Sequence, residues 1–304
     1  MIMGSNAEER AAVFQTLSQT VIDITGTHML QERRLRRSLE ARLSIAATEN
    51  PLGLDIDPGD LQAIEQLFSA SPPRLSEYRE AQLRELAFWR WVAFEGYGNR
   101  DPRLFPFHQQ HLMLSTFYKT GWSRSEFQQS RLIELGCGPL GMIEFLPGRE
   151  RVAFDPLNPA YARLFAHCRN ENIRYESDRQ VLADLPGGFD LAICHNVIDH
   201  TDDPAWWFDT LFNKLSPGGR FLIQVNLSRS DVPQDEEHRR MHPSPFSEAR
   251  IRSWLRAKSS RHFVHLETEP SGEGEFYCLA WGSKDSDEPV WYENEFAKTV
   301  NPEV

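Results

Sequence analysis

The sequence predicts an α/β fold: a seven-stranded, mostly parallel sheet with an antiparallel C-terminal hairpin, helices on both faces and a helical N-terminal extension. From residue 131 onward, short apolar or β-branched runs alternate with helical ones, which is typical of a parallel sheet covered on both sides. Only residues 270–274 join the last two runs, too few for a helical crossover, so these must pair antiparallel. The expected strands are 131–135, 151–155, 172–176, 189–195, 219–226, 262–269 and 275–282.

Helices between these strands have recognisable starting signals. Asn158 and Asp203 each directly precede a proline, and such side chains cap the first turn while proline suits the first helical position. Ser123 and Glu126 have the spacing of a capping box. The run SPGG at residues 216–219 ends the helix that follows Asp203.

The first 120 residues are predicted to be helical. One amphipathic run has leucines at every fourth position, and a second run follows it; they comprise Leu35, Leu39 and Leu43, then Leu83, Leu86, Ala87, Trp91 and Phe94. We therefore divide the chain into a helical region (1–120), a cofactor-binding domain (121–285) and a tail (286–304). Apolar periodicity is the same for a lid, an acceptor-selecting element or a homodimer interface, so these roles stay open for the first region.

Composition narrows the classes of function. The chain has 304 residues, 40% of them hydrophobic, which is enough for a large core. Its formal charge of −11 argues against a nucleic-acid surface, since such binding relies on Lys and Arg to neutralise phosphates. With neither a run of ~20 apolar residues nor a signal-peptide core, we expect a cytoplasmic protein without a membrane span.

Cysteine usage argues against a disulfide framework or a zinc site. Three of the four cysteines, Cys137, Cys194 and Cys278, lie in apolar, strand-like runs. Such positions are typical of buried, reduced thiols. We expect no metal.

A glycine-rich turn is the first feature that points to chemistry. The run GCGPLG at residues 136–141 follows an apolar strand, so its backbone can approach a cofactor closely. Asp155, at the end of the second strand, can accept hydrogen bonds from both hydroxyls of a ribose. A dinucleotide-binding fold has the same glycine spacing and the same acid. These two features alone leave a nicotinamide-dependent oxidoreductase open.

Segments farther along the chain distinguish between the possible classes of cofactor-binding protein. Together with 131–141 and 151–157, the segments 189–204 and 211–226 resemble the successive motifs of class I S-adenosylmethionine methyltransferases. This resemblance covers roughly residues 125–282. It implies an S-adenosyl-L-methionine cofactor and transfer of a methyl group. The alternatives are an NAD(P)-dependent oxidoreductase and a cofactor-binding protein of the same fold without turnover.

The same resemblance implies roles for single residues. Glu134 and the turn formed by Gly136 and Gly138 would face the methionine part of the cofactor. Asp155 would hold the ribose, and Leu157 would pack on the adenine.

Asn196 would line the pocket near the methionine end. Pro139 departs from the pattern, because it removes a backbone N–H donor that many relatives retain. The acid at the adenine edge is left open between Glu176, Asp178 and Asp184.

Residues 155–157 and 196–200 also resemble a bacterial subgroup of the family that is often met near polysaccharide or natural-product genes. We therefore expect a small-molecule or glycan acceptor, methylated on oxygen. A hydroxyl acceptor must lose its proton, so the reaction needs a base.

His200 is the preferred base, because it follows the fourth strand at the edge of the sheet where open α/β folds bind ligands. A purely structural role for His200 has equal weight: its side chain would hydrogen-bond the loop at the start of a helix. His195 is the second candidate, although the end of a buried strand favours a packed histidine. His238 and His242 have a spacing that could suit a metal in a helix, but with no third ligand in view a structural role is favoured.

Overall fold

The computed structural model describes residues 58–67, 69, 74–92, 105–165, 168–227, 240–258, 261–268, 276–284 and 290–291. Several sequence predictions lie outside the described residues, among them the leucine run from Leu35 to Leu43, Phe94, His238 and nearly all of the tail.

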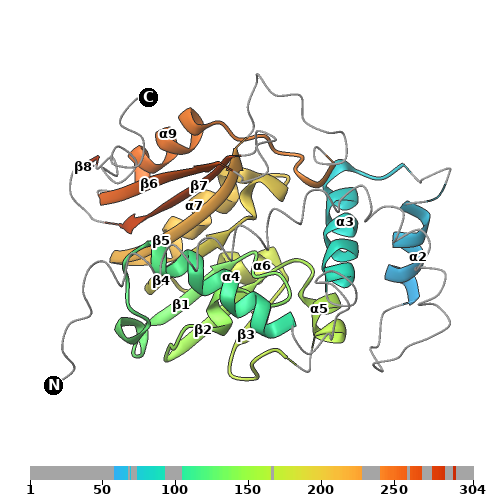
Figure 1. Cartoon of the computed structure of the whole chain (residues 1–304), viewed down its shortest axis with the longest axis horizontal. Coiled ribbons are helices and arrows are strands. Elements are labelled where there is room, and N and C mark those ends of the chain that lie inside the picture. Colours follow the sequence, from blue (N-terminus) through green and yellow to red (C-terminus); the bar gives the residue numbers. More distant parts are fainter. Residues whose placement is uncertain are drawn as a thin grey trace.

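The centre of the molecule is an eight-stranded sheet with the order β3-β2-β1-β4-β5-β7-β6-β8 (Figure 1). Strands β1 to β5 pair in parallel, and β7 runs antiparallel to both β5 and β6. All seven predicted strands and the antiparallel hairpin are confirmed, and the two-residue β8 extends the edge beside β6. The strands are β1 (Arg131–Leu135), β2 (Glu150–Phe154), β3 (Arg174–Glu176), β4 (Phe189–His195), β5 (Leu215–Leu227), β6 (Arg261–Thr268), β7 (Phe276–Ser283) and β8 (Val290–Trp291).

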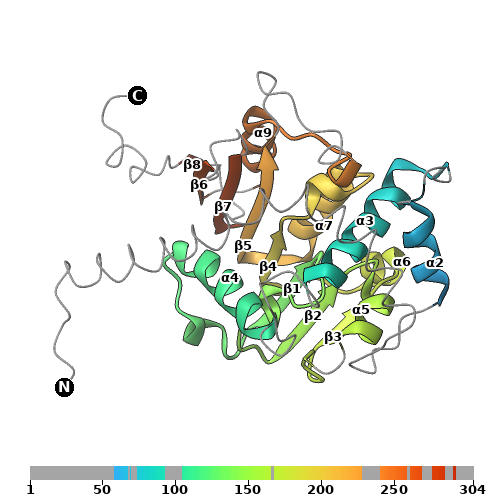
Figure 2. The ribbon, with the colours of Figure 1, turned by 45° about the vertical axis from the view of Figure 1, so that its right-hand side comes forward.

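Helices cover both faces of this sheet, as predicted. One face packs against α6 (Arg179–Asp184), α7 (Pro204–Lys214) and α9 (Glu248–Lys258). The other packs against α4 (Phe105–Lys119) and the short 3₁₀ helices η3 (Arg124–Phe127) and η4 (Met142–Glu144). A third apolar cluster joins α2 (Pro58–Leu67) and α3 (Glu77–Trp91) to α5 (Asn158–Leu164), and Figure 2 shows α3 beside α5 and α7.

Side-chain alternation along β1 explains why the strand is buried on both faces. Ile133 and Leu135 point into the cluster with α7, while Leu132 points into the cluster with α4. Between them Glu134 is 1% exposed, a carboxylate inside an otherwise apolar strand. Burying a charge without partners costs free energy, so a carboxylate at this position indicates polar contacts on which the fold relies.

Two of the predicted helix starts are confirmed. The Asp203 side chain accepts a hydrogen bond from the Trp206 N–H at the start of α7. Before η3, the backbone N–H of Ser123 donates to the Glu126 carboxylate in the predicted capping box.

The predicted cap at Asn158 is wrong, because α5 is preceded by Leu157 and begins with Asn158 itself. The Asn158 amide turns inward instead and donates to the carbonyls of Ala153 (3.2 Å) and Glu176 (2.7 Å). It thereby joins the ends of β2 and β3, while the helix start is left to the backbone.

The predicted state of the cysteines is confirmed. All four are free thiols, and Cys137, Cys194 and Cys278 are buried. Burial raises the pKa of each of these three thiols, which disfavours the reactive thiolate.

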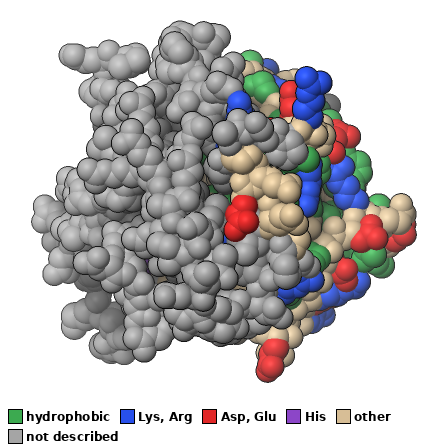
Figure 3. Space-filling model, turned by 90° about the vertical axis from the view of Figure 1, so that its right-hand side faces the viewer, with side chains coloured by type: hydrophobic (Ala, Val, Ile, Leu, Met, Phe, Trp, Pro, Cys, Tyr) green, Lys and Arg blue, Asp and Glu red, His purple; other side chains and the backbone are tan. Residues whose placement is uncertain are grey.

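On the face shown in Figure 3, acidic and basic side chains are interspersed over the described surface. Among the described helices, none has the length and apolar character needed to cross a bilayer.

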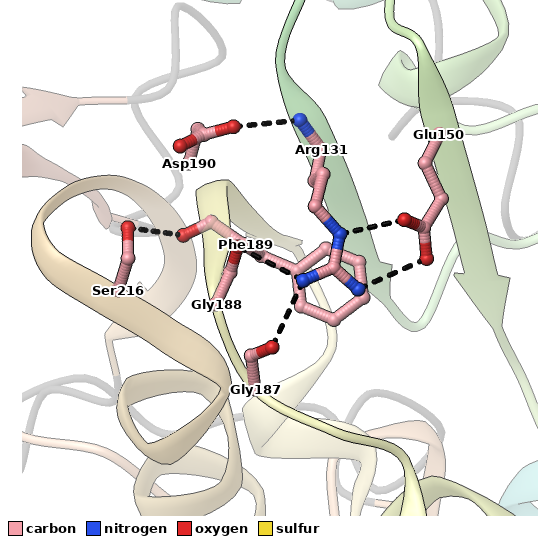
Figure 4. A network of polar contacts seen from close by, with 7 residues as sticks. All are labelled: Arg131, Glu150, Gly187, Gly188, Phe189, Asp190 and Ser216. Atoms are coloured by element: carbon pink, nitrogen blue, oxygen red, sulfur yellow. Dashed lines mark hydrogen bonds and ion pairs between the residues drawn. The ribbon is translucent and has the colours of Figure 1, made fainter.

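Arg131 ties together the starts of three segments (Figure 4). Its guanidinium contacts both carboxylate oxygens of Glu150 on β2, at 2.6 and 3.1 Å, and donates to the Gly187 carbonyl before β4. The same group lies 4.6 Å above the centre of the Phe189 ring, and the Arg131 backbone N–H donates to Asp190. This network lies at the amino ends of the strands.

We predict that Arg131→Ala lowers the free energy of unfolding by about 1–2 kcal/mol, since charge-assisted hydrogen bonds are lost but the group is partly exposed. Urea unfolding followed by circular dichroism measures it. Arg174→Ala is the control, because that side chain is more exposed and its guanidinium pairs with Glu176 on the same strand. An equal loss of stability in both variants would contradict the role of Arg131 in linking the three segments.

Candidate active site

The strand order reverses between β1 and β4, so the carboxyl ends of these two strands form the switch point at which open α/β sheets bind ligands. The glycine turn follows β1. Asn196 and η5 (Ile198–His200) follow β4. The residues predicted to bind the cofactor therefore converge on this edge.

Two glycines shape the turn. Gly136 and Gly138 have φ values of 73° and 55°, a region that side chains with a Cβ rarely adopt. A Cβ on Gly136 would lie 2.2 Å from a methyl carbon of Val197, so glycine is required for the close approach of the two strand ends. The Gly136 N–H donates to the Phe154 carbonyl at 2.6 Å, which ties the turn to β2.

Asp155 links the turn after β1 to the turn after β2. It accepts hydrogen bonds from the backbone N–H groups of Gly138 (2.9 Å) and Leu157 (2.8 Å). Burial raises the pKa of this carboxyl to about 6, although both hydrogen bonds oppose the rise. Each carboxylate oxygen has a further lone pair that a ribose hydroxyl can use. The donor missing at Pro139 leaves this arrangement intact, since Gly138 supplies the N–H that reaches Asp155.

Glu134 holds the other end of the turn. Its two oxygens accept from the backbone N–H groups of Met142 (3.1 Å) and Ile143 (2.8 Å). Burial raises the pKa of Glu134 to about 8, against these two hydrogen bonds. The predicted contact of Glu134 with the methionine part of a cofactor stays a prediction; the contacts seen are with the loop.

Helix α3 lies against the glycine turn. The Trp89 ring is the nearest group to a Cβ built on Gly138, at 3.7 Å. The indole N–H donates to Glu85 one helical turn earlier, at 2.5 Å. Burial raises the pKa of Glu85 to about 7, and the charges of Asp155 and Asp199 add to the rise. The helix thus brings a third, partly buried acid to the same edge.

Beyond β4, four side chains form what we call the histidine cluster: Glu85, Asp199, His200 and His242. Asp199 is 1% exposed, and one of its oxygens lies 2.5 Å from Nδ1 of His242. His200 has Nδ1 3.5 Å from Glu85 and Nε2 3.9 Å from Asp199. The two imidazole rings lie 4.1 Å apart.

Asn196 occupies the bend between β4 and this cluster. It adopts φ 56°, and its backbone N–H donates to the Gln224 carbonyl. Its side-chain oxygen is buried, and no described residue donates a hydrogen bond to it. Next to it, His195 is the last residue of β4 and pairs with Gln224 in the sheet.

The three candidate acids for an adenine edge have local partners. Glu176 pairs with Arg174 at 2.7 Å, Asp178 caps α6, and Asp184 binds Gln180 within the same helix. Leu157, predicted to pack on the adenine, is 9% exposed in the cluster between α3 and α5.

Sequence analysis missed Glu85 and the contact between Asp199 and His242. Glu85 precedes Trp89 by four residues, a spacing that places both on one helix face, but this spacing does not say which face meets the site. Asp199 and His242 are 43 residues apart, and neither periodicity nor motif spacing connects them.

A methyltransferase-domain family model matches residues 102–265, which is more than half of the chain. The chain therefore belongs to the methyltransferase-domain family.

Curated relatives include the ubiquinone biosynthesis O-methyltransferase of Caulobacter sp. (strain K31), 27% identical over 127 residues that cover 38% of this chain and 48% of the relative. The corresponding protein of Colwellia psychrerythraea is 26% identical over 172 residues, 53% of this chain and 68% of the relative. The match with the first spans about half of that relative's length.

Solved structures show the same fold. Phosphoethanolamine N-methyltransferase 2 of Haemonchus contortus, in complex with phosphomonomethylethanolamine and S-adenosylhomocysteine, has a TM-score of 0.51 at 14% identity, covering 71% of this chain and 61% of that one. The [4+2]-cyclase SpnF has a TM-score of 0.50 at 12% identity, covering 71% and 98%. At such identities the likeness concerns the fold alone.

We predict that Glu134→Ala lowers the free energy of unfolding by about 2–5 kcal/mol, because two buried backbone N–H groups lose their acceptor. Glu134→Gln keeps one acceptor oxygen and loses less. Urea unfolding of the two variants beside the wild type measures both effects. Wild-type stability of Glu134→Ala would contradict the structural role assigned to this carboxylate.

Proposed function

We propose that this chain is an S-adenosyl-L-methionine-dependent methyltransferase that methylates a hydroxyl group of a small-molecule or glycan acceptor. The observation that carries the proposal is the set of acids contributed by β1, the turn after β2 and the middle of α3. Glu85, Glu134 and Asp155 lie together where the sheet order reverses, and burial raises all three pKa values. Such a site suits a cofactor that carries positive charge and ribose hydroxyls.

The residues present fit this cofactor. Asp155 offers acceptor capacity for the ribose, and the buried Asn196 side-chain oxygen offers an acceptor for a donor that the described residues do not supply. The turn of Gly136 and Gly138 permits close approach of a ligand to the backbone. We assign Leu157 to the adenine and Glu134 to the support of the methionine end. When bound, the cofactor supplies an electrophilic methyl group.

The geometry disfavours the dinucleotide alternative. A dinucleotide fold places a pyrophosphate against free N–H groups at the start of a helix. Here the turn leads only into the three-residue η4, and Glu134 already accepts from the N–H groups of Met142 and Ile143. The buried acids would also repel phosphate.

For the acceptor we favour oxygen over nitrogen. Several curated relatives are O-methyltransferases by name, and histidines beside the end of β4 offer a base for the hydroxyl proton. His200 and His195, the two bases predicted from the sequence, are both candidates for removing this proton.

The first test is cofactor binding. Isothermal titration is expected to detect S-adenosylmethionine and S-adenosylhomocysteine, and fluorescence titration with NADH is expected to show no binding. Asp155→Asn should weaken S-adenosylhomocysteine binding about tenfold or more, because a charge-assisted acceptor is lost. Asp209→Asn, an exposed acid on α7, is the matched control. NADH binding without S-adenosylmethionine binding would refute the proposal.

Cofactor affinity should also depend on pH. The ionised form of Asp155 is the better acceptor for ribose hydroxyls, and its pKa in the free protein is raised to about 6. Affinity is therefore expected to rise from pH 5 to pH 7 as the carboxyl ionises, with Glu85, whose pKa is about 7, extending the rise. Titrations with S-adenosylhomocysteine at several pH values measure this. In Asp155→Asn the rise below pH 6.5 should flatten; an unchanged profile would exclude Asp155 as its source.

A further inference from the structure

The histidine cluster contains two imidazoles with different surroundings, and this difference bears on the base. His200 comes from η5, directly after β4, and His242 comes from the segment before α9. Both side chains are mostly buried, at 15% and 12% exposure. Burial alone therefore does not indicate which of the two histidines is the base.

The contact between Asp199 and His242 is short and well directed. A carboxylate oxygen lies 2.5 Å from Nδ1. Because an ionised carboxylate can only accept a hydrogen bond, this contact assigns the proton to Nδ1. In a neutral imidazole with its proton on Nδ1, Nε2 has the lone pair. This is the arrangement in which a carboxylate orients a histidine that acts as a base.

The backbone around His242 is fixed to the same element. The Ser244 N–H donates to the Asp199 carbonyl at 3.0 Å, and the Ser244 hydroxyl donates to the Thr201 carbonyl at 2.7 Å. With the contact from Asp199 to His242, these hydrogen bonds tie the segment to η5 at three points. A base held in this way needs little rearrangement before reaction.

His200 has a different environment. Each of its ring nitrogens faces a carboxylate within 4 Å, Nδ1 toward Glu85 and Nε2 toward Asp199. Both distances are longer than the 2.5 Å contact between Asp199 and His242, so they orient the His200 ring less strictly. The third histidine, His195, lies within the paired length of β4.

We propose that His242 is the general base of the methyl transfer and that Asp199 is its positioning residue, with His200 as a neighbour between Glu85 and Asp199. This inference rests on the proposed function and names the base for it. Nε2 of His242 takes the proton of the acceptor hydroxyl while the oxygen forms its bond to the methyl carbon and the bond from that carbon to the sulfonium sulfur breaks. The products are a methyl ether, S-adenosylhomocysteine and an imidazolium, which then releases its proton to solvent.

The first experiment determines which ring nitrogen of His242 carries the proton, and it needs no methyl acceptor. In ¹⁵N-histidine-labelled protein at pH 8, the signals missing from His242→Gln identify His242. We expect Nδ1 protonated and Nε2 unprotonated, and in Asp199→Asn a mixture of the two tautomers. The charged groups that face His242 among the described residues are Asp199 and His200 from η5 and, behind His200, Glu85 from α3. A proton on Nε2 of His242 in the wild type would overturn the proposal.

The second experiment measures release of S-adenosylhomocysteine with a panel of phenols and methyl glycosides as acceptors. His242→Ala should lower kcat by about 100-fold or more, with the affinity for S-adenosylmethionine unchanged. Asp199→Asn should lower kcat and leave KM near the wild-type value, and Asp199→Glu should restore part of the loss. His200→Ala should lose less than His242→Ala. His265→Gln, on β6, is the control and should keep wild-type turnover.

The outcomes separate this inference from the proposed function. If the wild type does not bind S-adenosylmethionine, the proposed function fails. If the wild type turns over and His242→Ala is equally active, this inference alone fails. Activity that is lost with EDTA and restored by a divalent cation would make Asp199, His200 and His242 metal ligands, since their ligand atoms lie within 4.8 Å of one another, and would overturn the role of His242 as base.

Discussion

The hydrogen bonds that the Asp155 carboxylate accepts from the backbone N–H groups of Gly138 and Leu157 are the contacts on which the site depends. They fix the turn after β1 against the turn after β2, so the two strand ends act as one rigid edge. Trp89 of α3 then packs on Gly138, and through Glu85 the helix reaches His200 after β4. One buried carboxylate thus fixes the glycine turn on which α3 packs, and α3 reaches the histidine cluster.

Buried acids at this edge create a free-energy cost that a ligand can relieve. The pKa values of Asp155, Glu85 and Glu134 are raised to about 6, 7 and 8, in each case chiefly by desolvation. Their neighbours within the protein are mostly backbone N–H groups and an indole, which compensate only part of the lost hydration. A cofactor with positive charge would stabilise the ionised forms, so binding and ionisation are expected to be coupled.

The fold does not by itself define the reaction. Structures of similar fold include an N-methyltransferase and a [4+2]-cyclase. Because one fold carries different reactions, the reaction depends on the set of side chains that each chain places around that fold. In this chain that set comes from α3, η5 and the segment before α9, three elements that lie outside the strands of the sheet. Acceptor choice is therefore expected to reside in these elements.

The sequence by itself determined the sheet and most helix starts, because those features depend on local patterns. Apolar runs placed all seven main strands, the short link at 270–274 required an antiparallel hairpin, and Asp203 capped α7 as expected. The predicted helix cap at Asn158 was wrong, because the Asn158 amide donates to carbonyls of β2 and β3 rather than capping its own helix. A local pattern cannot weigh such distant competitors.

Only the tertiary structure decided the composition of the histidine cluster. The sequence indicated His200 from its place after β4, and it assigned His242 a structural role, without a partner for it, because no third metal ligand was in view. The partner is Asp199, 43 residues earlier, brought beside it by hydrogen bonds between two loops, and Glu85 arrives from a helix that precedes the sheet. Helical and strand periodicity specify which face of an element is apolar, but the folding of the loops specifies which polar side chains meet.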